Sequence, residues 1–490
     1  MLFLSWLLLV AWLFWKHVVW RDEVRAFSLA LSGSSVGQML RNVQGEGHPG
    51  LWYLILRALH DVFPTREVLP AAALVIWIAA IALFTWKSPF RTFLVALVLF
   101  SLFGAFDYAV IARNYGIAAL VMFALAAVYP RVKRTLWFGL VLAVLANTNV
   151  PSTILAGAFL LFRFFEMLTD GKPTIRDWSI FAGNAFLSLV GAFLSFVLVY
   201  PPMNEGAVSL NYGHITLISI AAALADGTKG FSNLLLNAHG LAPPIILWTS
   251  CLAFVRRPPA LLAALAGLAG LKLFFFFVYP SGYRHEALFV VFLLALAWIE
   301  HESVDRASED KAWTQRVALI GRAALLLVLA AQTLDLGKPL LLQAKGLPFS
   351  QSANAARLIE RPDLKRAIVI ADPDLMLEPL PYYIDNPLWF LREERFDRLF
   401  FKTSSERQQI SLDTILVDAA RLNQTYRRPV VILLQTDLDA AKPGAHLTMY
   451  RDSTSVSQAA IGRFRRSTRL VARLGPAITD EHYDLYVYRG

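Results

Sequence analysis

Residues 2–23 read LFLSWLLLVAWLFWKHVVWRDE, a strongly apolar run that ends in two neighbouring acids, Asp22 and Glu23. No basic segment precedes the run and no Ala-x-Ala cleavage site follows it, so we interpret it as an uncleaved first membrane span rather than a secretion signal. Similar runs recur up to residue 334, and the whole chain is 57% apolar and only 17% charged. These patterns predict an integral membrane protein.

The apolar runs predict about eleven spans within residues 1–334. After the first span, residues 21–68 form a long external loop. Within it, residues 22–31 and 51–63 have helical character but are too short to cross comfortably, so we expect both to lie on the membrane surface. The remaining spans are expected at residues 69–86, 92–110, 115–129, 135–148, 152–168, 178–200, 241–255, 260–279, 287–299 and 317–334.

Basic residues gather in the short loops on one side of this threading. Residues 87–91, 131–134, 172–176 and 256–257 carry lysines and arginines, whereas the opposite short loops carry few. By the positive-inside rule we place these loops and the N-terminus in the cytoplasm, and we expect a multi-pass protein of the cytoplasmic (inner) membrane. The basic residues that give the net charge of +10 are spread among these short loops and through the C-terminal third, so a membrane explanation suffices and we expect no nucleic-acid partner.

Beyond residue 334 the composition becomes that of a soluble domain. Strand-like segments at residues 367–371, 430–434 and 483–488 alternate with helical stretches such as residues 414–426. Residues 335–490 are therefore expected to form a small external (periplasmic-side) α/β domain. A second external element, residues 201–240, is expected to be a partly helical flap that gates substrate entry. The predicted fold is a polytopic α-helical membrane protein with a C-terminal α/β domain.

The polar clusters of the membrane part all reach the outer side in this threading. They are Asp22-Glu23, the turn with Glu46 and His48, residues 107–113, residues 147–149 and residues 283–285. Ionisable groups are costly to hold at the mouth of a membrane bundle, so their gathering on one face suggests a reaction site.

The order of these motifs resembles the GT-C glycosyltransferases that use polyprenyl-phosphate sugars, including aminoarabinose transferases and protein O-mannosyltransferases. The Asp22-Glu23 pair after the first span is similar to the family's Asp-Glu pair. Residues 47–53 (GHPGLWY), 112–115 (ARNY) and 283–285 (YRH) resemble its His-Pro-Pro-Leu-Tyr-Tyr, Ala-Arg-x-Tyr and late Arg-Tyr motifs. Gly50 and His285 depart from the family's usual Pro and Tyr. The resemblance covers residues 1–334 and is much weaker over the tail.

Transfer of a sugar from a lipid phosphate to a hydroxyl group needs a base on the acceptor and cations on the departing phosphate. Asp22 is the candidate base, with Glu23 as its orienting or second acidic partner. Arg113 and Arg284 are the candidate phosphate ligands, because a guanidinium offers paired hydrogen bonds as well as charge. The substrate-binding set also includes Glu46, His48, Tyr115, Tyr283 and His285. Inversion at the sugar is what the resemblance and a single base imply.

Each of these residues also has a purely structural interpretation. The acids could cap the surface helix that starts there, the arginines could snorkel at helix ends, and His48 could stabilise a glycine-rich turn. No set of His and carboxylate residues has a metal-ligand spacing, and Cys251 is the single cysteine, so we expect no cofactor. The alternative is a divalent cation, which the resemblance implies for some GT-C branches such as the oligosaccharyltransferases.

The expected partners are a polyprenyl-phosphate-linked sugar donor, a glycolipid, glycan or protein acceptor, and the lipid bilayer. Two other functions remain open. One is a transporter or flippase for a lipid-linked or anionic solute, although such proteins place charges near the midplane and often contain two related halves. The other is a non-catalytic assembly factor whose external domain binds partners.

Overall fold

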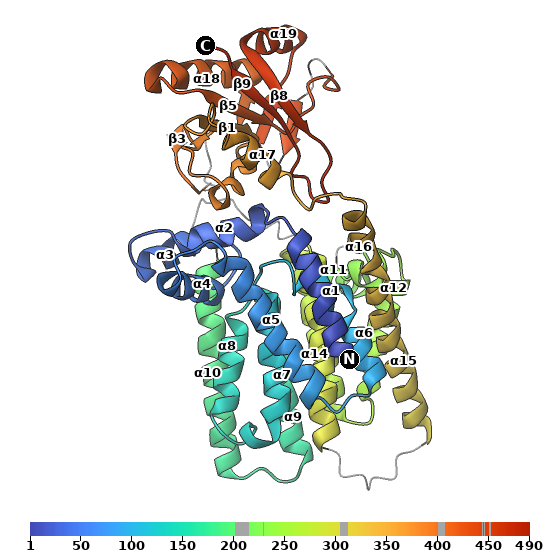
Figure 1. Cartoon of the computed structure of the whole chain (residues 1–490). Helices are drawn as coiled ribbons and strands as arrows, with labels where there is room; N and C mark the ends of the chain where they lie inside the picture. Colours follow the sequence, from blue (N-terminus) through green and yellow to red (C-terminus); the bar gives the residue numbers. More distant parts are fainter. Residues whose placement is uncertain are drawn as a thin grey trace.

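The structure is a computed structural model that describes residues 1–200, 215–228, 230–303, 312–399, 407–442, 444, 446–449 and 452–490. A long helical bundle carries the C-terminal domain at one end (Figure 1). The bundle consists of α1 (Leu2–Lys16), α5 (Val68–Lys87), α6 (Thr92–Leu99), the π-helical turn η1 (Phe103–Asp107), α7 (Tyr115–Val132), α8 (Trp137–Ala146), α9 (Val150–Thr169), α10 (Ile175–Val199), α12 (Ala242–Cys251), η3 (Leu252–Phe254), α13 (Pro258–Phe277), α14 (Tyr283–Ser303) and α15 (Ala312–Asp335).

Helical structure occurs in every segment expected to span the membrane, but not all of these helices are long. Among the described residues, six helices are long and apolar enough to cross a membrane, or up to seven if the bent α1–α2 pair is one span. The ten residues of α8 rise only about 15 Å, half the thickness of a hydrocarbon core. The expected number of about eleven spans thus corresponds to a mixture of full-length and shorter helices.

The chain turns sharply where the first apolar run ends. Helices α1 and α2 (Arg21–Ala30) meet at 85°, so α2 runs across the end of the bundle together with α3 (Val36–Val43) and α4 (Leu51–Val62) (Figure 1). Trp20 has an extended backbone and caps α2, and the Glu23 side chain returns to accept the Trp20 backbone N–H. The first turn of α2 therefore places both acids of the pair at the helix N-terminus, where negative charge is favourable.

Helices α8 and α10 approach closely because each contributes a glycine to the contact. A Cβ atom on Gly191 would lie 2.5 Å from Cα of Ala143, and one on Gly139 would lie 2.6 Å from Cα of Asn184. Asn184 also accepts the Gly139 backbone N–H through its side-chain oxygen at 2.8 Å. Small residues thus let the two backbones touch, as is common between membrane helices.

The expected flap at residues 201–240 lies partly outside the described residues. Its described part contains α11 (Leu217–Ala225) and the short turn η2 (Asn233–Leu235). The loops that join α5 to α6 and α9 to α10 lie at the end of the bundle away from the C-terminal domain (Figure 1). Both are among the basic loops of the sequence, at residues 87–91 and 172–176.

The tail forms the expected α/β domain. Its main sheet has the order β1 (Ile368–Asp372), β5 (Val430–Leu434), β9 (Tyr483–Tyr488), β8 (Thr468–Leu474), with β1 and β5 parallel and the other pairs antiparallel. The three strands expected from the sequence are thus neighbours. Smaller sheets and helices complete the tail: β2 (Trp389–Phe390) with β3 (Arg395–Phe396), β4 (Gln409–Ser411) with β7 (Asp452–Ser455) and β6 (His446–Met449), α16 (Gly337–Ala344), α17 (Ser352–Ile359), η4 (Asp374–Leu377), η5 (Leu380–Tyr382), α18 (Leu412–Tyr426) and α19 (Gln458–Ser467).

Alternate residues of the central strands pack against different layers. In β1, Ile368 and Ile370 join the apolar core that includes α18 and α19, whereas Val369 and Ala371 join the core that includes α17. This alternation follows from the two-residue period of a strand and explains why β1 and β5 are continuous apolar runs. Phe349, just before α17, still packs in the core of the membrane bundle. The separate core of the tail domain begins after it.

Candidate active site

Three consecutive residues at the start of α2 face three different environments. Glu23 is fully buried and accepts hydrogen bonds from the backbone N–H groups of Trp20 (3.1 Å) and Ala112 (2.6 Å), and its carboxylate pairs with Nε2 of His17 at 2.9 Å. The Asp22 side chain is 40% exposed, and its one ion pair within the described residues, with Arg21, is long at 4.0 Å. Arg21 reaches into the tail domain. Of the two predicted acids, only Asp22 has an accessible carboxylate.

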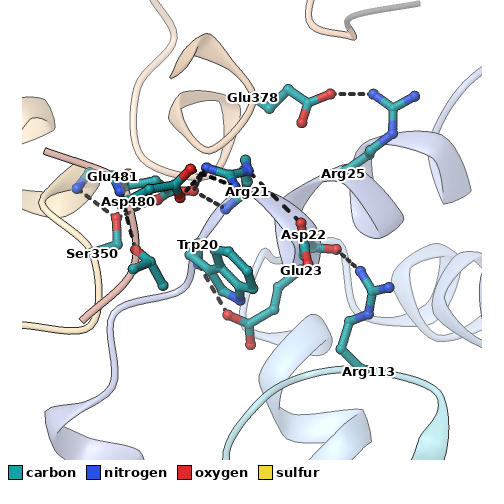
Figure 2. Close-up of polar contacts among 12 residues, drawn as sticks. Trp20, Arg21, Asp22, Glu23, Arg25, Arg113, Ser350, Glu378, Asp480 and Glu481 are labelled. Atoms are coloured by element: carbon teal, nitrogen blue, oxygen red, sulfur yellow. Dashed lines mark hydrogen bonds and ion pairs between the residues drawn. The ribbon is translucent and has the colours of Figure 1, made fainter. Parts of the chain in front are cut away.

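Arg113 lies in the loop before α7 and contacts the start of α2 directly. One terminal nitrogen of its guanidinium donates to the backbone carbonyl of Asp22 (Figure 2). The other terminal nitrogen donates to Nε2 of His48 at 2.7 Å. Nε2 of His48 must carry no proton to accept this bond. Glu23 accepts the backbone N–H of Ala112, the residue before Arg113. The loop, the His48 turn and α2 are therefore held together around Asp22.

Arg284 approaches the same region from the start of α14. Its guanidinium carbon lies 5.8 Å from the ring centroid of Trp20, and its Nε lies 3.3 Å from a carboxylate oxygen of Asp107. The Arg284 backbone carbonyl also accepts a hydrogen bond from Tyr108 at 2.6 Å. The two predicted arginines thus converge on residues 20–22 from segments that are far apart in the sequence.

Tyr115 and His285 form a hydrogen-bonded pair beside these arginines. Nδ1 of His285 accepts the Gly282 backbone N–H at 3.0 Å, so the proton of the neutral ring is on Nε2, which donates to the Tyr115 hydroxyl at 2.9 Å. Both Arg113 and Arg284 act electrostatically on Tyr115 and on His285. The Tyr115 hydroxyl hydrogen is left for another acceptor.

Tyr283 faces a different neighbourhood from the other predicted residues. Its hydroxyl donates to the side-chain oxygen of Gln332 on α15, whose amide donates to the Leu234 carbonyl at 2.6 Å. Tyr283 therefore links α14 to α15 and to the turn η2. In the structure it supports the bundle beside the site rather than joining the group around Asp22.

Glu46 is paired with an arginine that the sequence analysis did not select. Arg25 donates from Nε to one oxygen of Glu46 at 2.7 Å and from a terminal nitrogen to the other, and it also pairs with Glu378 of the tail. The Glu46 carboxylate is therefore engaged in holding the loop that carries His48. These charged residues also surround Tyr53 on α4: burial raises the pKa of its phenol, and the charges of Glu46, Arg113 and Arg25 act on it as well.

The tail domain supplies further acids to the same end of the bundle. Arg21 forms a two-bond ion pair with Asp480 at 2.6 and 3.1 Å, and its backbone N–H donates to Glu481 at 2.9 Å (Figure 2). Burial raises the pKa of Glu481 to about 7, although Ser350, Arg21 and Ser352 stabilise its charged form. No sequence motif marks these partners. Some 459 and 460 residues separate Arg21 from Asp480 and Glu481.

Several other polar residues have structural roles. The Asn149 side chain caps α9 by accepting the Ser152 backbone N–H at 2.9 Å. Asp374, in the Asp-x-Asp sequence of the tail, accepts the backbone N–H groups of Leu391 and Arg392. Within the described ranges, no group of three or more His, Cys, Asp or Glu side chains could hold a metal ion.

No protein-family model matches the chain, and no curated protein matches it in sequence. The similar solved structures include two of ArnT from Cupriavidus metallidurans. The crystal structure bound to undecaprenyl phosphate has a TM-score of 0.50 and 14% identity, and the apo crystal structure has a TM-score of 0.51 and 15% identity. Each alignment covers 99% of this chain and 97% of the other chain.

The chain has the ArnT fold. This likeness agrees with the architecture expected from the sequence, a polytopic bundle followed by an α/β domain. The motifs that resemble the GT-C family lie within residues 1–334, whereas the likeness to ArnT also covers the tail. The C-terminal domain is thus part of the shared architecture.

Proposed function

We propose that the chain is a membrane glycosyltransferase that moves one sugar from a polyprenyl-phosphate donor to a hydroxyl group of an acceptor. The observation that supports this most is the convergence of Asp22, Arg113 and Arg284 at the start of α2, in a chain with the ArnT fold. One of the two ArnT structures holds undecaprenyl phosphate, a lipid phosphate of the proposed class.

In the proposed reaction, Asp22 removes the proton of the acceptor hydroxyl. The acceptor oxygen then forms a bond to the anomeric carbon of the sugar, and the bond from that carbon to the phosphate oxygen breaks. The electron pair of the broken bond leaves with the polyprenyl phosphate. A positioned base contributes about 10²- to 10⁴-fold to such a step. A single displacement of this kind inverts the configuration at the sugar.

Arg113 and Arg284 neutralise the negative charge of the departing phosphate in this proposal. The Arg284 guanidinium is partly exposed beside Trp20, and Arg113 is oriented by His48 and the Asp22 carbonyl, so its planar group is already fixed. A pre-oriented guanidinium stabilises developing phosphate charge without reorganising during the reaction. The Tyr115 hydroxyl hydrogen is available for a phosphate or sugar oxygen. Glu23 acts as a positioning residue.

The site faces the outer side of the cytoplasmic membrane in this proposal, with the N-terminus in the cytoplasm. The support comes from the basic loops at residues 87–91 and 172–176, which lie at the end of the bundle away from the C-terminal domain. The proposed acceptor is a glycolipid, glycan or protein of the cell envelope, and the residues named above perform the transfer without a metal ion.

Reconstituted protein tests the proposal directly. Proteoliposomes receive a panel of labelled polyprenyl-phosphate pentoses and hexoses, with an envelope extract as the acceptor mixture. We expect release of free polyprenyl phosphate that depends on the acceptor and is lost in Asp22→Asn. Asp61→Asn, which neutralises an exposed acid on the neighbouring helix α4, is the matched control. Movement of intact donor across the membrane without release would instead identify a transporter.

A further inference from the structure

We propose that the C-terminal domain holds helix α2 in the orientation that presents Asp22, and that Glu378 and Asp480 are positioning residues of the transfer reaction. This inference rests on the proposed role of Asp22. It assigns a task to the tail domain, whose acids lie on the opposite side of α2 from Arg113 (Figure 2).

The first clamp joins the N-terminal turn of α2 to the end of the tail. Both terminal nitrogens of Arg21 donate to the two carboxylate oxygens of Asp480, and the Arg21 backbone N–H donates to the fully buried Glu481. Glu481 is itself held by the hydroxyl groups of Ser350 and Ser352. A paired arginine–carboxylate contact defines an orientation as well as a distance.

The second clamp lies one helical turn further along α2. The Arg25 side chain is 10% exposed and pairs with Glu378 of the tail and with Glu46 of the first loop. Residues four apart lie on the same face of a helix, so Arg21 and Arg25 present one face of α2 to the tail. Glu46 in turn belongs to the turn of His48, which accepts from Arg113. The tail is thus connected to both sides of the proposed site.

Asp22 lies between the parts that hold α2. Arg21 is bound to the tail, Glu23 is bound to the bundle through Ala112, and Arg113 holds the Asp22 carbonyl. Only the Asp22 carboxylate in this turn extends into partly open space. Loss of a clamp leaves the carboxylate intact but removes one of the supports that aim it. A displacement of about 1 Å in a reacting group can lower a rate by about 100-fold.

Other contacts between the tail and residues 19–66 are consistent with a fixed interface. The Tyr383 hydroxyl donates to the Val19 carbonyl at 2.7 Å, just before α2. Arg66 donates to the Tyr382 carbonyl at 2.8 Å, and Phe349 packs on Trp20 with ring centroids 5.7 Å apart. These contacts keep the tail in place when one charged clamp is removed, so single variants in the clamps are expected to retain the overall fold.

The test uses the full chain in proteoliposomes and the transfer assay described above. Glu378→Gln and Asp480→Asn remove one charge each, and Asp439→Asn, which weakens two exposed ion pairs within the tail, is the matched control. We expect each clamp variant to lower kcat by about 10- to 100-fold with little change in the KM for the donor. Glu378→Asp, which restores the charge, should recover part of the lost activity.

A double variant separates positioning from a general loss of structure. If the clamps act through Asp22, adding Glu378→Gln to Asp22→Asn should lower the residual rate no further. A general structural defect would instead lower the rate by the same factor in the wild type and in Asp22→Asn. Hydrogen exchange over residues 21–30 should also be faster in each clamp variant than in Asp439→Asn. Unchanged exchange and unchanged kcat in both clamp variants would overturn the inference. Full activity of Asp22→Asn would instead refute the proposed role of Asp22 as the base. Faster hydrogen exchange in the clamp variants would in that case still show that the tail holds α2.

Discussion

The neighbouring acids Asp22 and Glu23 predict opposite phenotypes when each is made neutral. Both substitutions, Asp22→Asn and Glu23→Gln, preserve size and remove one negative charge. The structure gives the two carboxylates different surroundings, because one is 40% exposed and the other is fully buried. The pair therefore tests whether the site has been divided correctly into a reacting group and a supporting group.

Glu23→Gln should mainly reduce stability. The carboxylate accepts from the backbone N–H groups of Trp20 and Ala112 and pairs with His17. A glutamine keeps one acceptor oxygen, but its NH₂ group replaces the second oxygen and cannot accept a hydrogen bond from the donor there. Each lost hydrogen bond to a charged group is worth about 1.5–3 kcal/mol, so losing one or two predicts a destabilisation of about 2–5 kcal/mol. Activity should fall only as far as folded protein is lost or α2 shifts.

Asp22→Asn should leave stability almost unchanged and remove activity. The Asp22 carboxylate has a long ion pair of 4.0 Å with Arg21, and pairs of this kind at exposed positions are worth about 0–1 kcal/mol. Loss of a general base should reduce turnover by about 10²- to 10⁴-fold. The Arg113 contact uses the backbone carbonyl of Asp22 and survives the substitution.

Thermal unfolding in detergent and single-turnover transfer, measured on the same preparations, provide both quantities. The expected pattern is a normal unfolding midpoint with little transfer for Asp22→Asn, and a lowered midpoint for Glu23→Gln. The reverse pattern, a stable but inactive Glu23→Gln beside an active Asp22→Asn, would refute the assignment. It would show that the buried acid becomes accessible during turnover.

Three further predictions concern the rest of the chain. Arg113→Lys should lower transfer by about 10- to 100-fold, the value of one charge-assisted hydrogen bond, because an ammonium group cannot bridge His48 and Asp22 as the guanidinium does; wild-type turnover would contradict this. Burial raises the pKa of Glu481 from 4.5 to about 7, so this carboxyl stabilises the fold fully below pH 4.5 and loses that contribution as the pH rises through about 7. The free energy of unfolding should therefore change less with pH over this range in Glu481→Gln than in the wild type. An equal pH dependence in the two proteins would argue against a raised pKa of Glu481. Gly191→Val should destabilise the protein by about 1–3 kcal/mol in thermal unfolding and leave the activity of the folded fraction unchanged, because a Cβ atom there would lie 2.5 Å from Cα of Ala143.

Local sequence patterns were sufficient to predict most of the secondary structure. Apolar runs coincide with the helices of the bundle, and the β-branched runs at residues 367–371 and 430–434 form adjacent parallel strands. The spacing of apolar residues along the chain indicates which face of a helix or strand is buried, so it predicts secondary structure from local sequence alone. They were less informative about helix length, since α8 and α6 are short segments within longer apolar runs.

The sequence by itself determined that the protein has a membrane bundle, that a separate α/β domain follows, and that acids and arginines occupy the ends of specific helices. It favoured Asp22 as the base, but it could not show which of the two carboxylates, Asp22 or Glu23, is accessible. Only the tertiary structure decided that, because a helix turns by about 100° per residue and its rotation depends on what packs around it. The structure alone also revealed that Glu378 pairs with Arg25 and Asp480 with Arg21, across separations of 353 and 459 residues. Such pairs leave no local pattern, because they are created when two independently patterned domains meet.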